Sequence, residues 1–226
     1  MRIDINNGFV RLDNYEASDL SVVNAARVSF GTRKDFLDES DVGLIKFLMK
    51  NRHGTPFEHN FFRFHIKTPI FVAREWFRHR IGSFNEFSMR YAVPSLDFYL
   101  PEVDKFRTQV GKPGSYTFEQ MDNSNGELEY IRLAMADVCQ HAEDVYEQLL
   151  ESGVAKELAR IILPVNTYTE FYWSVNARAL INFISLRNAP EAMLEIREFA
   201  EVIEDIFSRC MPVTYEAFLE SGRIAI

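Results

Sequence analysis

Cysteine is scarce in this chain of 226 residues. The two present, Cys139 and Cys210, form no CxxC pair and no zinc-like spacing, so the sequence predicts neither a disulfide framework nor a structural metal site. No apolar run approaches the roughly 20 residues needed to cross a bilayer. The opening sequence MRIDINNGFV lacks the charged and then apolar pattern of a signal peptide. We therefore expect a cytoplasmic protein with no membrane partner.

Glycine-rich phosphate motifs are also missing. The ten glycines contain neither GxGxxG nor a P-loop, which excludes a Rossmann dinucleotide site. Basic charge is in short supply too, because the formal net charge is -8. Proteins that coat duplex nucleic acid usually carry a basic surface, since phosphate contacts dominate that affinity. The composition argues against nucleic-acid partners, whereas a small nucleotide needs only a local basic pocket.

What the chain does have is typical of a soluble globular protein. Hydrophobic residues make up 47% of it, and the twenty phenylalanines suggest a dense aromatic core. No repeat or linker divides the sequence, so we predict one domain over 1–226 with an irregular excursion near 100–126. Strands and helices intermix without βαβ alternation. This order predicts an α+β fold with a mixed or antiparallel sheet and flanking long helices.

Periodicity places the elements of the first half. The turn Asn6-Asn7-Gly8 predicts two short strands, and Asp19 to Ser29 predicts a helix. Ser40 is a plausible N-cap for a second helix that runs to about Asn51. The alternation of Phe62, Phe64 and Ile66 with polar residues predicts a half-buried strand. A helix with Pro69 at its first position and Gly82 as its terminator follows.

The second half is predicted to be mainly helical. Glycine and proline punctuation favours helices over Glu127 to Ser152 and Lys156 to Ile162. Asn166 to Val175 is rich in Tyr, Thr, Phe and Trp, which predicts a strand. Three more helices should follow: one capped by Asn176, a long one opened by Pro190 and a short one after Pro212.

The segment from Arg78 to Tyr91 reads RHRIGSFNEFSMRY and is the most unusual in the chain. Its three arginines offer planar forks that match phosphate oxygens. The serines and the asparagine add neutral donors, while Glu86 can accept from a base or a ribose hydroxyl. Such a set suits an anionic heterocyclic ligand. A solvated surface ion-pair cluster is the plainer explanation, and composition alone favours the two about equally.

The segment matches every specified position of RHRxxSxNExSxRY, so the chain resembles the flavin-dependent thymidylate synthases. The stretches AARVS at 25–29, HGTPFE at 53–58 and 160–187 also resemble family segments in the expected order. The resemblance implies reductive methylation of dUMP to dTMP. It also implies methylenetetrahydrofolate as carbon donor, FAD as hydride carrier and NADPH as reductant. It further implies a homotetramer whose sites are shared between subunits, and an FAD site that is not of the Rossmann type.

Residue roles follow from the same resemblance. The FAD contacts it implies are His53, Thr55, Arg78, His79, Arg80, Glu86, Asn176, Arg178 and Asn182. The nucleotide contacts it implies are Glu75, Trp76, Arg78, Glu86, Phe87, Ser88, Met89, Arg90, Arg160 and Arg187. Arg187 would act catalytically, because it would favour negative charge on the uracil ring. Taken singly, Asn176 could be only a helix cap and Arg160 only a last-turn arginine.

Two departures from the family pattern bear on the substrate. Glu75 stands where many members carry a glutamine, and an ionised carboxylate cannot donate a hydrogen bond. Glu191 and Met193 replace a histidine and a glutamine of some relatives. An alternative therefore stays open, in which the chain acts on another pyrimidine nucleotide or installs a hydroxymethyl group.

Other chemistries are less favoured. Cys139 and Cys210 both lie in helical apolar contexts, so we expect buried hydrophobes and not a thiolate nucleophile. His53, His59 and His65 recur every six residues beside Glu58, but zinc ligands usually lie closer, and we predict no metal. A non-enzymatic nucleic-acid-binding module could use the aromatic and basic residues of the motif, yet the acidic net charge counts against it.

Overall fold

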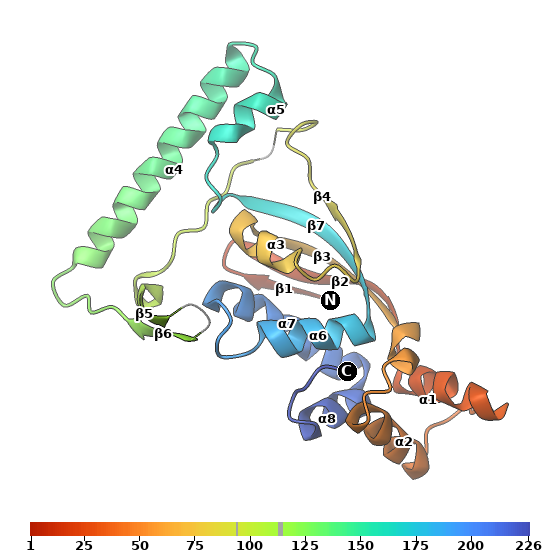
Figure 1. The fold of residues 1–226 in the computed structure, drawn as a ribbon. Helices are drawn as coiled ribbons and strands as arrows, with labels where there is room; N and C mark the ends of the chain where they lie inside the picture. The colour runs from red at the N-terminus through yellow and green to blue at the C-terminus, as the bar shows by residue number, and fades with distance from the viewer. Residues whose placement is uncertain (94, 113–114) are drawn as a thin grey trace. The chain divides into compact units, whose positions relative to one another are not determined.

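The computed structural model describes residues 1–93, 95–112 and 115–226. Its chain order mixes strands and helices (Figure 1). The strands are β1 Arg2–Ile5, β2 Gly8–Glu16, β3 Phe61–Pro69, β4 Ser83–Glu86, β5 Arg107–Lys112, β6 Ser115–Gln120 and β7 Tyr168–Asn176. The α-helices are α1 Asp19–Arg27, α2 Glu39–Lys50, α3 Ile70–Trp76, α4 Glu127–Glu151, α5 Lys156–Ala159, α6 Ala177–Arg187, α7 Leu194–Cys210 and α8 Pro212–Glu220. Short 3-10 turns include η2 Thr55–His59 and η4 Arg160–Ile162.

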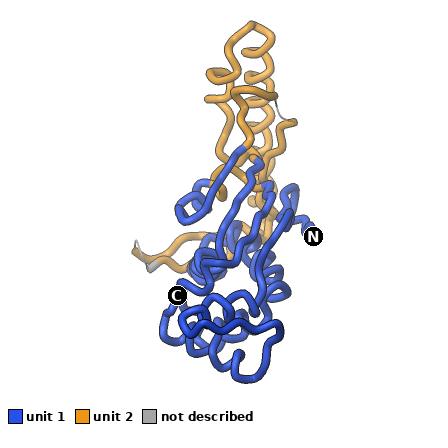
Figure 2. Tube along the Cα trace, turned by 90° about the vertical axis from the view of Figure 1, so that its right-hand side faces the viewer, with its two compact units in different colours: residues 1–67, 74–86, 170–226 blue, residues 68–73, 87–169 orange. Residues whose placement is uncertain are grey.

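The chain separates into two compact units, each built from discontinuous segments (Figure 2). Unit 1 comprises 1–67, 74–86 and 170–226, and unit 2 comprises 68–73 and 87–169. The expectation of one domain over 1–226 stays a prediction.

One five-stranded sheet organises the fold, in the order β1-β2-β3-β7-β4. The pairs β1–β2, β2–β3 and β4–β7 are antiparallel. On β3 the side chains of Phe62, Phe64 and Ile66 are buried, as their alternation predicts. The α+β class and the antiparallel sheet are therefore confirmed.

Aromatic rings fill the core of unit 1. Trp76 contacts the rings of Phe171, Trp173 and Phe183 with centroid distances of 4.7–5.5 Å. Phe64 stacks on Trp173 at 5.8 Å. Rings packed edge-to-face or offset contribute beyond their buried area. This core supports α6, which carries several of the predicted site residues.

Helices complete unit 1. α7 packs on β1 and β2 and also on α6 and α8, and α8 packs on α2. α7 has an apolar stripe that includes Ile196, Phe199, Ile203 and Phe207, all of them buried. This 3.6-residue spacing explains why α7 lies flat against its neighbours.

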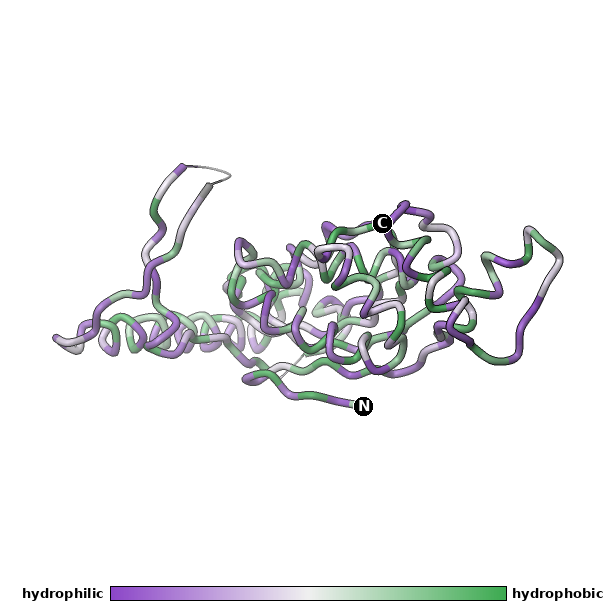
Figure 3. Tube along the Cα trace, turned by 90° about the horizontal axis from the view of Figure 1, so that it is seen from below, coloured by the Kyte–Doolittle hydropathy of each residue, from purple (hydrophilic) through white to green (hydrophobic). Residues whose placement is uncertain are grey.

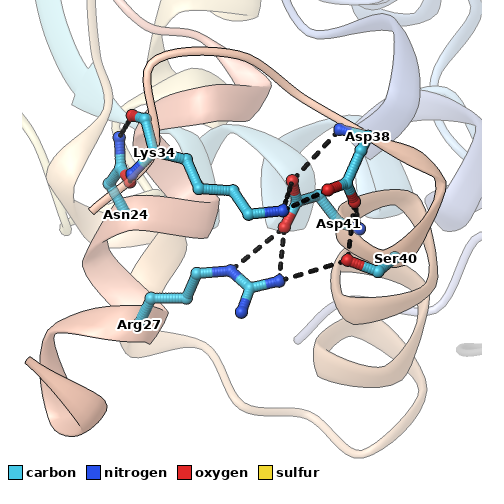
Figure 4. Close-up of polar contacts among 6 residues, drawn as sticks. All are labelled: Asn24, Arg27, Lys34, Asp38, Ser40 and Asp41. Atoms are coloured by element: carbon cyan, nitrogen blue, oxygen red, sulfur yellow. Dashed lines mark hydrogen bonds and ion pairs between the residues drawn. The ribbon is translucent and has the colours of Figure 1, made fainter. Parts of the chain in front are cut away.

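Asp41 joins α1, α2 and the loop between them (Figure 4). Its buried carboxylate accepts hydrogen bonds from Arg27 at 2.5 Å and from Lys34 at 2.8 Å. It also accepts from the backbone of Asp38, whose own side chain caps the helix at the Asp41 amide. Burial raises the pKa of Asp41, but the Lys34 and Arg27 hydrogen bonds outweigh it and hold that pKa below its usual value. The cluster is therefore a charged clamp at the start of α2.

Unit 2 contains the long helix α4, with α5 and η4 packed against it. Asn166 bonds the Cys139 thiol of α4 at 3.2 Å and the Tyr99 carbonyl at 2.8 Å. The backbone amides of Ile70 and Phe71 donate to the carbonyls of Thr167 and Val165 at 2.9 Å.

Several predicted boundaries are wrong by a few residues. Asp38, not Ser40, caps α2, because Asp38 forms a capping box with Asp41. Pro69 ends β3, and α3 starts at Ile70, so this proline does not open the helix. That helix ends at Trp76, well before Gly82, and the chain then turns into β4, a strand not predicted from the sequence.

In the second half of the chain one predicted boundary is wrong and others are confirmed. Pro190 does not open the long helix: it lies in a turn, and α7 begins at Leu194. The predicted helices over Glu127 to Ser152 and after Pro212 are confirmed by α4 and α8. Within 100–126, expected to be irregular, β5 and β6 form an antiparallel hairpin. Residues 113 and 114 of that excursion lie outside the described residues.

Hydrophobic residues are spread along the trace in short stretches (Figure 3). Among the helices described, none is both long and apolar enough to cross a membrane. Likewise, within the described ranges no three His, Cys, Asp or Glu side chains gather as a metal-binding group.

Candidate functional site

A pocket of about 570 Å³ opens in unit 1 beside α6 and the segment after α3. Most of its polar lining residues are ones to which the family resemblance assigns a role. The lining residues are Glu58, Arg78, His79, Arg80, Ile81, Asn176, Arg178, Ala179, Asn182, Leu186, Arg187 and Ile226. The structure thus brings 78–80 and 176–187 together, although nearly a hundred residues separate them in the sequence.

The segment 78–80 reaches the pocket because α3 stops early. The amides of Arg78 and His79 donate to the carbonyls of Glu75 and Trp76, which makes a turn at the helix end. The chain then enters β4, which pairs with β7. An alanine Cβ at Gly82 would lie 2.8 Å from the Trp173 indole nitrogen, so only glycine leaves room for this return.

Helix α6 supplies the other wall. Asn176 caps it, since the Asn176 side chain accepts a hydrogen bond from the Ala179 amide at 2.9 Å. Arg178 and Asn182 lie four residues apart, and so on one face, and both line the pocket. Asn176 lines it too, so the cap and the predicted binding role coexist in one residue.

The pocket is basic in a protein that is acidic overall. Four arginines and one glutamate line it, against a net charge of -8 for the whole chain. Glu58 pairs with Arg178 at 2.5 Å and partly offsets that charge. Positive charge concentrated in a concave site attracts anions and raises their local concentration. The pocket can therefore hold an anionic ligand.

Arg187, in the last turn of α6, is fixed by two groups. Its Nε donates to the His79 Nε2 at 2.9 Å, and its Nη1 pairs with the Glu75 carboxylate. Burial and the Arg187 charge lower the pKa of His79 to about 4, so the imidazole is neutral at pH 7. The ring therefore accepts at Nε2 and carries its proton at Nδ1.

Trp76 does not line this pocket. Its side chain has no exposed surface and lies in the aromatic core of unit 1, and its nucleotide contact stays a prediction. Glu75 does not line the pocket either, but pairs with Arg187, which does.

His53 and Thr55 lie apart from this pocket. They line a separate cavity of about 400 Å³ with Ala25, Ala26 and Ser29 of the AARVS segment. Glu86 lies exposed on β4 and lines neither cavity. The predicted FAD contacts therefore lie in two separate cavities and, for Glu86, on the exposed strand β4. The role of each residue stays a prediction.

The remaining predicted nucleotide residues belong to unit 2. Phe87, Ser88, Met89 and Arg90 form a turn after β4, in which Met89 is buried. Arg90 pairs with the Glu157 carboxylate at 3.5 Å, while Arg160 donates to the Glu157 carbonyl at 3.4 Å. Glu157 thus brings two arginines that are predicted nucleotide contacts into one exposed cluster.

Sequence reasoning missed some residues around these groups. Glu58 pairs with Arg178, although it stood in the recognised HGTPFE segment and could have been assigned from it. Lys156 donates to the Tyr91 carbonyl at 3.2 Å and adds a cation near the 87–90 turn. Nothing in the sequence around Lys156 indicates this contact.

Comparison with known proteins identifies the family of the chain. The model of the family described as "Thymidylate synthase complementing protein" matches residues 11–213. The flavin-dependent thymidylate synthase of Thermosipho melanesiensis is 46% identical over 216 residues, 96% of this chain and 92% of its own. That of Thermus thermophilus is 44% identical over 218 residues, 96% of this chain and 77% of its own.

Solved structures also match. The UMP/dUMP methylase PolB from Streptomyces cacaoi bound with 5-Br dUMP aligns with a TM-score of 0.87 and 39% identity, covering 97% of this chain and 98% of that one. The form bound with 5-Br UMP aligns with a TM-score of 0.88 and 40% identity, covering 97% of both chains. With the family model spanning most of the sequence, the chain belongs to the flavin-dependent thymidylate synthase family.

Proposed function

We propose that this chain converts dUMP to dTMP by reductive methylation. The observation that carries the proposal is the convergence of Arg78, Arg80, Arg178 and Arg187 on one pocket of an otherwise acidic protein. The family supplies the reaction class, and the pocket supplies the chemistry expected of a site for phosphorylated ligands.

The pocket suits part of a flavin dinucleotide. Its volume of about 570 Å³ lies within the usual range for ligand sites. Arg78, Arg80 and Arg178 can donate to a pyrophosphate, while Asn176 and Asn182 offer amide groups for a ring or a ribose. When bound, the flavin supplies the hydride chemistry that no amino-acid side chain can perform. The protein's contribution is to bind and orient.

Arg90 and Arg160 are proposed to hold the nucleotide phosphate. Both are exposed and both contact Glu157, whose carboxylate would release Arg90 when a more highly charged phosphate binds. Ser88 adds a hydroxyl in the same turn. All residues of this cluster belong to unit 2, and their positive charges alone would attract an anion.

A cysteine nucleophile has no support in this chain. Cys139 is buried and accepts a hydrogen bond from Asn166. Burial raises the pKa of the Cys210 thiol, which disfavours the thiolate that would attack. We therefore assign activation of the uracil ring to Arg187, which would stabilise negative charge on the base as its C5 carbon becomes nucleophilic.

The co-substrates and assembly are part of the same proposal. Methylenetetrahydrofolate would provide the methylene carbon. NADPH would provide one hydride, that is two electrons and a proton, which reaches the methylene carbon through the flavin and completes the methyl group; tetrahydrofolate and NADP⁺ are left. We also propose a cytoplasmic homotetramer in which each FAD lies between subunits, in line with the resemblance of the 78–91 motif.

The test is mass analysis of the nucleotide after anaerobic incubation of purified protein with FAD, NADPH, methylenetetrahydrofolate and dUMP. We expect dTMP, and we expect its formation to require both FAD and NADPH. A hydroxymethylated product would favour the alternative reaction. Protein that binds no flavin would contradict the proposal as a whole.

A second substrate is favoured by one specific comparison. The PolB relative, similar over nearly its whole length, was solved with both 5-Br dUMP and 5-Br UMP. We therefore propose UMP as a competing substrate of this chain. Incubation with an equal mixture of UMP and dUMP, followed by mass analysis, measures the preference directly. The absence of any methylated UMP when UMP is the only nucleotide would rule this activity out.

A further inference from the structure

Glu75 has a place in the structure that the motif alone does not explain. Its carboxylate pairs with Nη1 of Arg187, and Nε of Arg187 donates to the His79 ring. The side chains of Glu75 and Arg187 are only 27% and 19% exposed. Glu75, Arg187 and His79 therefore form one half-buried line within unit 1, of which Arg187 and His79 line the pocket.

The hydrogen bonds of this line fix its protonation. A guanidinium only donates, so the Nε2 atom of His79 must be unprotonated to receive it. A protonated His79 would lose this bond and place two cations side by side. Glu75, by contrast, brings a negative charge that compensates Arg187. The stable arrangement therefore joins the Glu75 carboxylate, the Arg187 guanidinium and a neutral His79 imidazole, in that order in space.

The same bonds leave one nitrogen of the Arg187 guanidinium, Nη2, for a ligand. Within the described ranges, no group hydrogen-bonds to its Nη2 atom, and Arg187 lines the pocket. Two of the three guanidinium nitrogens are thus held by the protein and the third is available. A guanidinium held at two points keeps its plane, so Nη2 donates in a fixed direction.

An exposed ion pair would not have this effect, because surface pairs contribute little and are screened. The Lys46–Glu220 pair is such a case, with side chains 39% and 56% exposed. Glu75 differs because it is enclosed and because its partner is in turn bonded to a pocket residue. Its role is therefore carried through Arg187 and not through contact with a ligand.

We propose that Glu75 is a positioning residue for nucleotide methylation, which holds the Arg187 guanidinium in the plane that the pyrimidine ring meets. The methylation part rests on the proposed function above. The geometric part, that Glu75 orients Arg187 against His79, can be tested without any substrate.

The geometric test uses protein labelled with ¹⁵N-histidine. Wild type, E75A, E75Q and the matched control E220A are compared, and H79Q identifies the His79 signals among the five histidines. We expect His79 to be protonated at Nδ1 in wild type, E75Q and E220A, because glutamine can still accept from Arg187. In E75A the released Arg187 should leave His79 as a mixture of tautomers with a higher pKa. An unchanged His79 spectrum in E75A would overturn the proposal.

The kinetic test separates positioning from flavin binding. We expect E75A to lower kcat for dTMP formation about tenfold or more, whereas the rate of flavin reduction by NADPH changes less than about twofold. E75Q should recover kcat to within about threefold of wild type. A wild-type kcat in E75A, or equal losses of kcat in E75A and E75Q, would contradict the positioning role of Glu75. If E75A does not fold, E75D, which withdraws the carboxylate by one methylene, is read the same way.

Together the two tests distinguish a failure of the proposed function from a failure of the role given to Glu75. Wild-type protein that forms no methylated nucleotide would overturn the proposed function, and the His79 spectra would then decide alone whether Glu75 orients Arg187. Protein that makes dTMP but whose E75A variant keeps the wild-type spectrum would overturn only the role of Glu75.

Discussion

Arg178 occupies a space that a single glycine keeps open. A Cβ atom at Gly54 would lie 2.5–2.8 Å from the end of the Arg178 side chain, and Glu58 binds Arg178 from the same turn. The backbone at 54–58 and the carboxylate together aim one cation into the pocket. This arrangement explains why the HGTPFE segment matters for a site whose other members lie far away in sequence.

Replacement of Arg178 by alanine should therefore weaken flavin binding. We expect the dissociation constant for FAD to rise about tenfold or more, since a charge-assisted contact is lost and Glu58 stays behind unpaired. Quenching of flavin fluorescence measures it. Arg209→Ala is the matched control, because Arg209 forms only an exposed pair with Asp205 on α7. Equal affinities in the two variants would contradict the role of Arg178.

His79 makes stability depend on pH in a defined window. Its pKa in the folded protein is about 4, below the ordinary value of 6.5, so the unfolded chain takes up a proton first as the pH falls. The stabilisation is complete above pH 6.5 and is lost as the pH falls towards 4. Allowing for the partial exposure of His79, the loss at pH 5 is about 1 kcal/mol, or about 2–4 °C in Tm.

The measurement compares thermal unfolding of wild type and His79→Gln at pH 7 and pH 5, without ligands. Glutamine can accept from Arg187 but does not titrate in this range. We expect the Tm of the variant to fall less than that of wild type. Parallel falls would mean that carboxylates alone set the acid sensitivity.

At the scale of elements, the start of α2 depends on Asp41. Replacing it with alanine removes the half of the capping box that accepts from the Asp38 amide, and it leaves Arg27 and Lys34 without their buried partner. We expect a loss of about 2–3 kcal/mol in the free energy of unfolding, measured with urea. Glu39→Ala, an exposed change in the same turn, should cost well under about 1 kcal/mol. Similar losses in both variants would show that the clamp adds nothing.

Periodic elements were predictable from sequence, and their boundaries were not. The alternation in β3 and the pattern of α4 are local properties and were confirmed. Pro69 illustrates the failures. The amides of Ile70 and Phe71 bond to Thr167 and Val165, so distant residues keep the chain extended through a proline that locally favours a helix start.

The site shows the same division between local and distant information. The resemblance carried by the 78–91 motif grouped Arg78 and Arg80 with residues of α6, and the pocket brings them together, because family resemblance carries long-range information that spacing does not. The link from Glu75 to Arg187 joins α3 to α6 and has no trace in either segment alone. Trp76 lies two residues before Arg78, which lines the pocket, while its own side chain is buried in the core, so its predicted nucleotide contact stays a prediction.

For the whole molecule, the proposed homotetramer predicts a native mass of about four times 26.3 kDa. The motivation is local: Tyr130, Leu133 and Val138 of α4 are 61–74% exposed, more than a folded monomer usually leaves on one helix. Light scattering after size-exclusion chromatography measures the mass. A monomeric mass at micromolar concentration would exclude the assembly, and Leu133→Glu should shift the mass downwards if α4 lies at an interface.

The discontinuity of unit 1 has a consequence for how the chain folds as it is made. β1, β2 and β3 leave the ribosome early, but the second neighbour of β3 in the sheet, after β2, is β7, which begins at Tyr168. The helices that cover β1 and β2 and that pack on α2 follow later still, ending with α8. The emerging polypeptide must therefore carry an uncovered, phenylalanine-rich strand face through most of its synthesis, which makes nascent chains arrested before α7 natural clients of holding chaperones.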